Sequence, residues 1–265
     1  MDHMEQPTST APTGPEPQNW EADVILNDGD IATLRPITPA DRDAIRAFYD
    51  RVSDQSKYLR FFGTHPTLTD DDLDRWLHTD GYDKVTLVMV ERGNVVAVAG
   101  YSIVEQFLPA RVGDVSFLVQ DSHHGKGVAN ILLEHLAEIG REGKVERFFA
   151  EMLTQNRRMV QVFVRAGYSA KPGLEDGFIR VDFRIAPNEN SRDVMERREL
   201  RAEANSIHRL LNPRSVAVVG TLSSKQLASA GFSGSLHNLH SVDELYDLDK
   251  PVDLVVIEFQ GHGGT

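Results

Sequence analysis

The residues whose types and spacing suggest chemistry lie in one stretch of the chain, from Ser116 to Leu133. Its centre holds two glycines, Gly125 and Gly127, which let the backbone approach a ligand closely. A helix that begins directly after such a turn points the unpaired amides of its first turn, at the positive end of its dipole, towards the same place. The stretch therefore predicts a turn that binds phosphate, and pyrophosphate in particular.

A strand and a helix must hold this turn in place. Apolar side chains at every second position, Val115, Phe117 and Val119, predict a strand before the turn. A helix after the turn, ending near Gly143, is predicted by apolar residues at the spacing i, i+3, i+4 and i+7, which are Ala129, Leu132, Leu133 and Leu136.

Two common nucleotide-binding turns do not match this sequence. It contains no Gly-x-x-x-x-Gly-Lys-Ser/Thr motif, and Asn130 takes the place of the third glycine in Gly-x-Gly-x-x-Gly. The remaining stretch, His124-Gly-Lys-Gly127-Val-Ala129, resembles the pattern Gln/Arg-x-x-Gly-x-Gly/Ala of the acetyl-CoA loop in the GNAT family of N-acetyltransferases. The resemblance implies that acetyl-CoA is a cosubstrate. It also implies that backbone groups bind the pantetheine arm at Phe117, Leu118 and Val119, and the pyrophosphate at His124, Gly125, Lys126, Gly127, Val128 and Ala129.

The resemblance covers about residues 30–185. It matches residues 31–36 to a first strand, 84–90 and 94–104 to a hairpin, 146–153 to a later strand and 156–166 to a last helix before Gly167. It implies an α/β fold, a mixed central sheet flanked by helices, and places Asn156, Met159 and Phe163 at the cofactor. Asn156 could bond the pantetheine arm, cap the helix, or do both. Phe163 stands where many relatives use a tyrosine as the acid for the leaving group.

The expected reaction needs a base. A lysine ammonium has no lone pair, and with a pKa of about 10.4 its deprotonation at pH 7 costs roughly 4 to 5 kcal/mol. In the family a glutamate in the pattern Glu-x-x-Phe accepts the proton, and Asp114 stands at that position before Phe117. Because aspartate is shorter by about 1.5 Å, we expect a bridging water. Glu105 is the second candidate base, and either residue could instead be an ordinary polar residue of a strand end or loop.

Within the family, residues 53–62 resemble the Ser-x-x-Ser-x-Tyr-x-Arg-Phe-Phe segment of bacterial protein lysine acetyltransferases of the Pat type. Some of these are joined to a domain of an acyl-CoA synthetase. The resemblance implies direct acetyl transfer to a lysine of a protein, with acyl-CoA synthetases as the expected substrates. A small-molecule amine acetyltransferase and a non-catalytic CoA-binding regulatory protein remain as alternatives.

We expect four parts in the chain. They are a disordered tail at 1–22, the acetyltransferase domain at 23–187, a helical linker at 188–211 and a small, partial Rossmann-like α/β segment at 212–265. Residues 210–220 and 252–257 resemble the CoA-binding domain of ADP-forming acyl-CoA synthetases, with fully buried parallel strands at 216–219 and 254–257. The segment after Gly220, from Thr221 to Ser224, is short for a phosphate-holding turn.

Composition limits the function further. The net charge of −12 argues against binding to nucleic acid or an anionic membrane, which needs a basic surface. The absence of cysteine excludes disulfides and an acyl-cysteine intermediate, and fits a cytoplasmic location. No apolar run reaches the roughly 18 residues of a membrane span. His123 and His124 point to opposite sides of an extended chain, so we expect no metal site. Homo-oligomerisation stays open.

Overall fold

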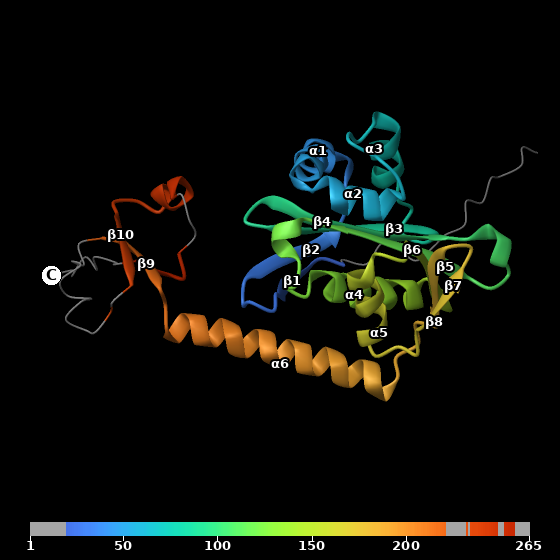
Figure 1. Cartoon of the computed structure of the whole chain (residues 1–265). Coiled ribbons are helices and arrows are strands. Elements are labelled where there is room, and N and C mark those ends of the chain that lie inside the picture. The colour runs from blue at the N-terminus through green and yellow to red at the C-terminus, as the bar shows by residue number, and fades with distance from the viewer. Residues whose placement is uncertain (1–19, 221–231, 233, 249–251, 258–265) are drawn as a thin grey trace, which may run out of the picture. The chain divides into compact units, whose positions relative to one another are not determined.

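A computed structural model describes residues 20–220, 232, 234–248 and 252–257 (Figure 1). The chain divides into two compact units, Met1–Glu199 and Leu200–Thr265. Most of the tail expected at 1–22, and the shortened segment from Thr221 to Ser224, lie outside the described residues.

The first unit is built on an eight-stranded sheet with the strand order β1-β2-β3-β4-β5-β6-β8-β7. Neighbouring strands are antiparallel except β5 and β6, which run parallel. The mixed sheet predicted from the sequence is thus confirmed. The strands are β1 (Ala22–Ile25), β2 (Ile31–Pro36), β3 (Lys84–Glu91), β4 (Asn94–Ile103), β5 (Val112–Val119), β6 (Arg147–Leu153), β7 (Lys171–Glu175) and β8 (Phe178–Arg184).

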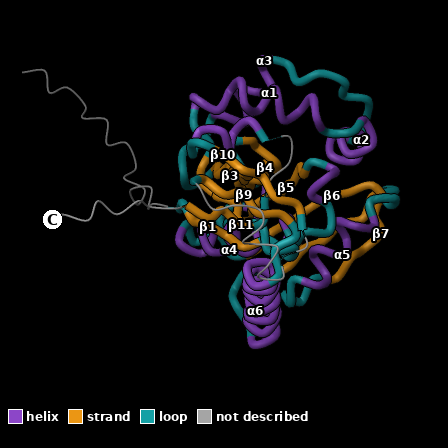
Figure 2. The backbone as a smooth tube through the Cα atoms, turned by 90° about the vertical axis from the view of Figure 1, so that its left-hand side faces the viewer, coloured by secondary structure: helices purple, strands orange, loops and turns teal. Residues whose placement is uncertain are grey.

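Helices cover both faces of this sheet (Figures 1 and 2). One face carries α1 (Arg42–Arg51), α2 (Asp54–Phe61) and α3 (Asp70–Leu77), and the other carries α4 (Val128–Glu142) and α5 (Arg157–Arg165). Three short 3-10 turns lie in the connections: η1 (Pro39–Asp41) between β2 and α1, η2 (Glu105–Phe107) between β4 and β5, and η3 (Asp121–His123) between β5 and α4. A long helix, α6 (Glu189–Leu211), follows the sheet, where the sequence predicts a helical linker.

The alternation along β5 explains how it fits between the two layers. Val115, Phe117 and Val119 pack into the core beneath α4, whereas Leu118 packs into the core on the α1 and α3 side. Successive side chains of a strand point to opposite faces, so β5 contributes to both cores.

Three of the four residues in the apolar stripe predicted for the helix after the turn are buried, whereas Ala129 is partly exposed and lines a pocket. Leu132, Leu133 and Leu136 have no exposed surface, and each such side chain contributes about 1.5 to 3 kcal/mol of burial. The helix begins at Val128 and ends at Glu142, with Gly143 as its C-cap, which confirms the predicted end.

The second unit contains a three-stranded parallel sheet with the order β10-β9-β11. Its strands are β9 (Ser215–Val219), β10 (Ser235–Leu239) and β11 (Leu254–Ile257), and η4 (Asp243–Asp247) precedes β11. The predicted parallel pairing is confirmed, and β9 is buried. The prediction of full burial is wrong for β11, whose Val255 and Ile257 are 38% and 42% exposed because the strand lies at an edge of this sheet.

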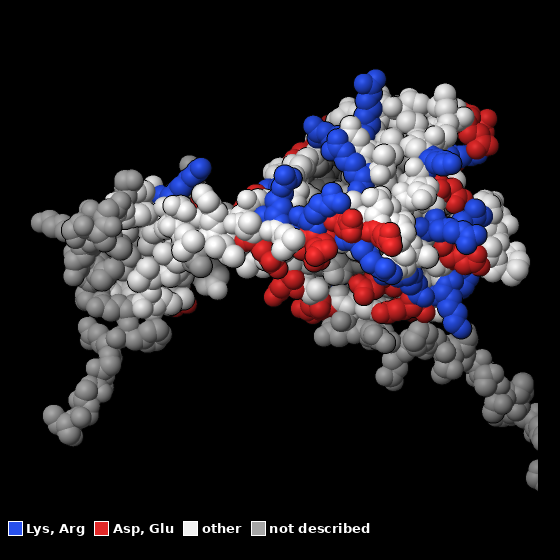
Figure 3. All heavy atoms as spheres, turned by 90° about the horizontal axis from the view of Figure 1, so that it is seen from below, with Lys and Arg blue, Asp and Glu red and all other residues white. Residues whose placement is uncertain are grey.

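Charged side chains are interspersed on the surface of the first unit, where acidic and basic groups alternate over the face seen in Figure 3. Ion pairs such as Arg147 with Asp182 and Arg197 with Asp193 bring opposite charges together. Within the described residues, no helix combines the length and apolar character that a bilayer crossing requires.

Candidate functional site

The site is a cleft that opens where β5 and β6 separate. These parallel strands pair at three positions only, of which the last joins Asp114 to Phe149. β5 continues to Val119 and β6 to Leu153 without further pairing to each other, and a cleft of about 1370 Å³ lies between them. Beyond Asp114, the edge of β5 that faces β6 therefore has backbone groups available to a ligand.

The glycine turn lies at this cleft and has the expected conformation. Gly125 and Gly127 have φ angles of +83° and +85°, which favour glycine. A Cβ at Gly127 would also lie 2.8 Å from the Asn27 side chain. Directly after the turn, the amides of Val128, Ala129 and Asn130 begin α4 and have no intrahelical partner. The open backbone at Gly125 and these amides fit the diphosphate of CoA.

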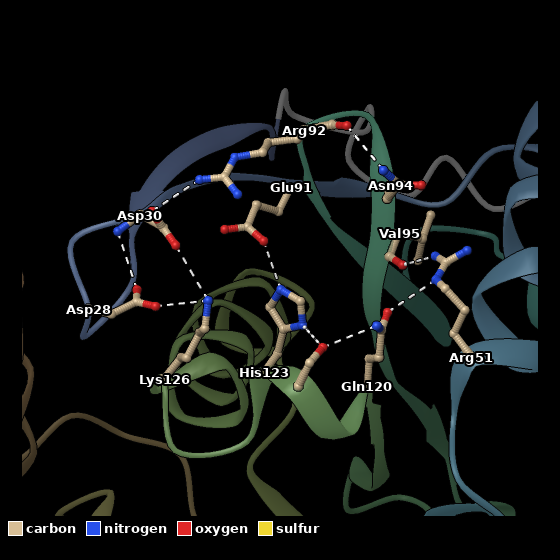
Figure 4. Close-up of polar contacts among 11 residues, drawn as sticks. Asp28, Asp30, Arg51, Glu91, Arg92, Asn94, Val95, Gln120, His123 and Lys126 are labelled. Atoms are coloured by element: carbon tan, nitrogen blue, oxygen red, sulfur yellow. Dashed lines mark hydrogen bonds and ion pairs between the residues drawn. The ribbon is translucent and has the colours of Figure 1, made fainter. Parts of the chain in front are cut away.

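Side chains on the far side of the turn hold it in place (Figure 4). Lys126 Nζ lies 2.8 Å from an Asp28 oxygen and 3.4 Å from Asp30 Oδ2. Burial opposes the charge of this ammonium, but Asp28 outweighs it and the pKa of Lys126 is raised. Below the turn, His123 Nε2 lies 2.8 Å from Glu91 Oε2 in a buried pair. Lys126 and His123 thus anchor the turn to β3 and to the β1–β2 connection.

The backbone amide of His124 and both nitrogens of its ring contact other groups of the protein. Its amide donates to the carbonyl of Asp121 at 3.1 Å, its Nε2 lies 3.1 Å from the carbonyl oxygen of Val119, and its Nδ1 lies 2.9 Å from Arg158 Nη1. The resemblance implies that the backbone amide of His124 binds the pyrophosphate. In the structure that amide and both ring nitrogens are engaged within the protein.

Asp114 is the acidic group at the point where the strands part. The side chain of Asp114 is exposed to the cleft, and the walls of the cleft surround it with protein atoms. Burial raises the pKa of Asp114, nearby Arg60 opposes this rise, and Glu151 on β6 adds to it. A carboxylate with a raised pKa is a better proton acceptor, so its environment suits a general base.

The other predicted site residues fall into two groups. Met159 and Asn156 line the cleft, and Asn156 Oδ1 also accepts from the Met159 amide at 3.3 Å as the N-cap of α5. Glu105 lies in η2 and does not line the cleft. Phe163 is 1% exposed and packs edge to face on Phe117, away from the cleft.

The structure therefore gathers most of the predicted residues around one cavity. Leu118 takes part through its backbone alone, because its side chain is buried in the opposite core. The predicted residues that line the cleft are Asp114, Phe117, Leu118, Val119, His124, Gly125, Gly127, Val128, Ala129, Asn156 and Met159.

Several lining residues have no predicted role from the sequence. Arg60 on α2 donates from Nη2 to Ser116 Oγ at 2.9 Å. Arg60 lies in residues 53–62, the segment that resembles Pat-type enzymes, and this resemblance was the one feature of the sequence that pointed to it. Glu151 and Arg158 come from β6 and α5, and only the folded chain brings them to β5 and the turn.

The end of the cleft beneath α2 and α3 is aromatic. The Phe61 ring stacks on His65 with centroids 4.2 Å apart, and Trp76 lies parallel to Phe61 at 6.3 Å. His65 Nε2 lies 3.3 Å from Asp72 Oδ2, and Tyr49 donates its hydroxyl to the His65 carbonyl at 2.6 Å. This arrangement offers flat apolar surface beside a buried carboxylate.

Comparison with known proteins agrees with this geometry. Residues 32–169 match the family described as "Acetyltransferase (GNAT) domain". The chain is 45% identical to the crystal structure of the GNAT domain of Streptomyces lividans PAT, with a TM-score of 0.59 over 62% of this chain and 97% of that one.

Two curated relatives are more distant in sequence. Acetyltransferase Pat of Mycolicibacterium smegmatis is 28% identical over 54% of this chain, and the match spans only 43% of that protein's length. Acetyltransferase PA5475 of Pseudomonas aeruginosa is 22% identical over 57% of this chain and 82% of the relative.

Proposed function

This chain belongs to the GNAT acetyltransferase family, and from that premise we propose that it acetylates lysine side chains of a protein. As a member it is an N-acetyltransferase that uses acetyl-CoA. The protein acceptor is supported by the similarity to the GNAT domain of S. lividans PAT and by the Pat-like segment 53–62. Acyl-CoA synthetases are the acceptors that this resemblance favours.

One observation carries the proposed mechanism: Asp114 lies at the last pair of β5 and β6 and lines the same cleft as the glycine turn and the aromatic residues Phe61 and Trp76. The first amides of α4 would hold the diphosphate, and the unpaired edge of β5 would bond the pantetheine arm. Acetyl-CoA supplies the acetyl thioester. The acceptor amine would enter past Phe61 and Trp76, whose rings suit the aliphatic arm of a lysine.

Asp114 prepares the nucleophile. Its carboxylate accepts a proton from the lysine ammonium, directly or through one water, and leaves a neutral amine. The amine nitrogen then bonds to the thioester carbon, the carbon–sulfur bond breaks and CoA leaves as a thiolate. The second proton lost from the nitrogen passes to the thiolate or to solvent, and a neutral amide remains. The chain has no cysteine that could form an acyl-enzyme, so transfer is direct.

Arg60 limits how far burial raises the pKa of Asp114. Burial raises the pKa of Asp114, which increases its basicity but reduces the charged fraction at neutral pH. The Arg60 guanidinium counteracts the rise and favours the ionised form of the carboxylate. Its hydrogen bond to Ser116 fixes this cation beside β5.

An acetylation panel tests the proposal. The full chain is incubated with radiolabelled acetyl-CoA and three acceptor groups: acyl-CoA synthetases, lysine peptides and small amines. We expect acetyl-lysine on a synthetase, located by peptide mass spectrometry, and no label when that lysine is replaced by arginine. Turnover with small amines alone would contradict the protein acceptor. Binding of acetyl-CoA by calorimetry without any product would contradict the enzymatic assignment.

A further inference from the structure

The turn that would bind the diphosphate carries basic side chains that are directed elsewhere. Lys126 forms ion pairs with Asp28 and Asp30, and His123 hydrogen-bonds to Glu91 (Figure 4). Lys126 does not line the cleft, and Nε2 of His123 is occupied by Glu91. A diphosphate carries negative charge, and a protein with a net charge of −12 repels it at long range.

The two contacts of the His124 ring indicate which nitrogen donates and which accepts. The Val119 carbonyl oxygen can only accept, so Nε2 at 3.1 Å must carry the proton. Nδ1 is then an acceptor, and it receives the hydrogen bond from Arg158 Nη1 at 2.9 Å. His124 thus bonds Arg158 through Nδ1 and holds it against the turn.

Arg158 is the cation that this arrangement brings to the turn. It lies in the first turn of α5 and lines the cleft together with Gly125 and Gly127. Among the described residues no carboxylate forms an ion pair with Arg158, and its guanidinium contacts His124, whose Nδ1 also lies 4.0 Å from Asp121 Oδ1. Four of its five N–H groups remain for a ligand.

We propose that Arg158 binds the diphosphate of CoA, and that α5 thereby supplies the guanidinium that the glycine turn itself does not present. The inference rests on the acetyl-CoA site of the proposed function. The diphosphate is favoured over the 3′-phosphate because Arg158 is hydrogen-bonded to the residue directly before Gly125, where the open backbone begins. Arginine forms charge-assisted, bidentate hydrogen bonds with phosphate oxygens.

Calorimetry with two ligands tests which phosphate is bound. We expect Arg158→Ala to weaken CoA and 3′-dephospho-CoA by the same factor, about tenfold, as for one charge-assisted hydrogen bond. Arg192→Ala removes the same charge from an exposed position outside the cleft and should leave both affinities unchanged. A loss seen with CoA but not with 3′-dephospho-CoA would overturn the assignment to the diphosphate.

A rescue and a truncated ligand separate binding from structural damage. The double variant His124→Arg/Arg158→Ala places a guanidinium at position 124, beside the position from which it was removed. CoA affinity should therefore recover relative to Arg158→Ala. Pantetheine, which lacks the diphosphate, should bind wild type and Arg158→Ala equally in NMR titrations. Unchanged CoA affinity in Arg158→Ala would overturn this inference alone, whereas a wild-type chain that binds no CoA would overturn the cofactor assignment beneath it.

Discussion

Arg60 donates a hydrogen bond from Nη2 to Ser116 Oγ at 2.9 Å, and this bond ties α2 to β5 two residues beyond Asp114. The bond holds the guanidinium of Arg60 beside β5, the strand that carries the proposed base Asp114. Arg60 also affects the charge of Asp114. Burial raises the pKa of Asp114, and the guanidinium of Arg60 opposes this rise.

Replacing Arg60 by glutamine should shift the pH dependence of turnover. Glutamine can still donate to Ser116 but carries no charge, so the pKa of Asp114 rises further above its ordinary aspartate value. A base must be deprotonated to act, and the acidic limb of the kcat profile should therefore move to higher pH. Ser116→Ala keeps the charge and serves as the control with a smaller shift. An acidic limb at the same pH in wild type and Arg60→Gln would contradict the role of Arg60.

Gly127→Ala should weaken acetyl-CoA binding and lower stability. The new methyl group would lie at a φ of +85° and 2.8 Å from Asn27, which displaces the turn and costs about 1 to 3 kcal/mol. Gly93→Ala, at a φ of +75° with open space around it, measures the backbone cost alone. Chemical denaturation and calorimetry compare the two. Equal losses of stability with full CoA affinity in both would show that the turn tolerates the change.

Arg198→Ala should destabilise the first unit, because Arg198 pairs with Glu134 at 2.7 Å in a largely buried site. Burial raises the pKa of Glu134 and Arg198 opposes the rise, so the variant leaves a buried carboxylate that resists ionisation. The free energy of unfolding, measured by urea denaturation, should fall by about 2 to 4 kcal/mol. This loss should grow as the pH rises through the pKa of Glu134, because a buried carboxyl group without its partner is tolerated when protonated but not when ionised. Arg197→Ala, from an exposed pair with Asp193, should change stability by less than about 1 kcal/mol. Equal effects of both variants would refute the buried pair.

A chain that ends after Asn212 should keep most of its turnover. It retains the Arg198–Glu134 pair and the contact of buried Ser191 with Gly167, which a cut at residue 191 would remove. The residues that line the cleft all lie before residue 166. Rates with acetyl-CoA and an acceptor protein, with circular dichroism to verify folding, check this. Complete loss of activity in a folded truncation would assign the second unit an essential role.

Local patterns predicted the elements that carry the site. The alternation of Val115, Phe117 and Val119 and the apolar stripe with Leu132 and Leu136 each report the burial of a single strand or helix, and both are confirmed. Asp114 could be found because the expected base has a fixed spacing from Phe117 on one strand.

The separation of β5 from β6, and the approach of Arg60 and Arg158, depend on contacts between distant segments. No period in the sequence encodes these contacts, so the sequence did not assign a role to either arginine. The burial of β11 was overestimated for a related reason. An apolar run such as Leu254–Ile257 indicates a parallel strand but does not tell whether that strand lies in the middle of its sheet or at an edge.

The most direct measurement is the rate at which wild type and Asp114→Asn acetylate an acyl-CoA synthetase, followed by the intact mass of the acceptor at saturating acetyl-CoA. The proposal predicts one acetyl-lysine with wild type and a rate lower by about 100-fold or more for Asp114→Asn, with acetyl-CoA affinity unchanged by calorimetry and activity retained by Asp114→Glu. Equal rates for wild type and Asp114→Asn, or an acceptor that wild type leaves unmodified, would contradict it.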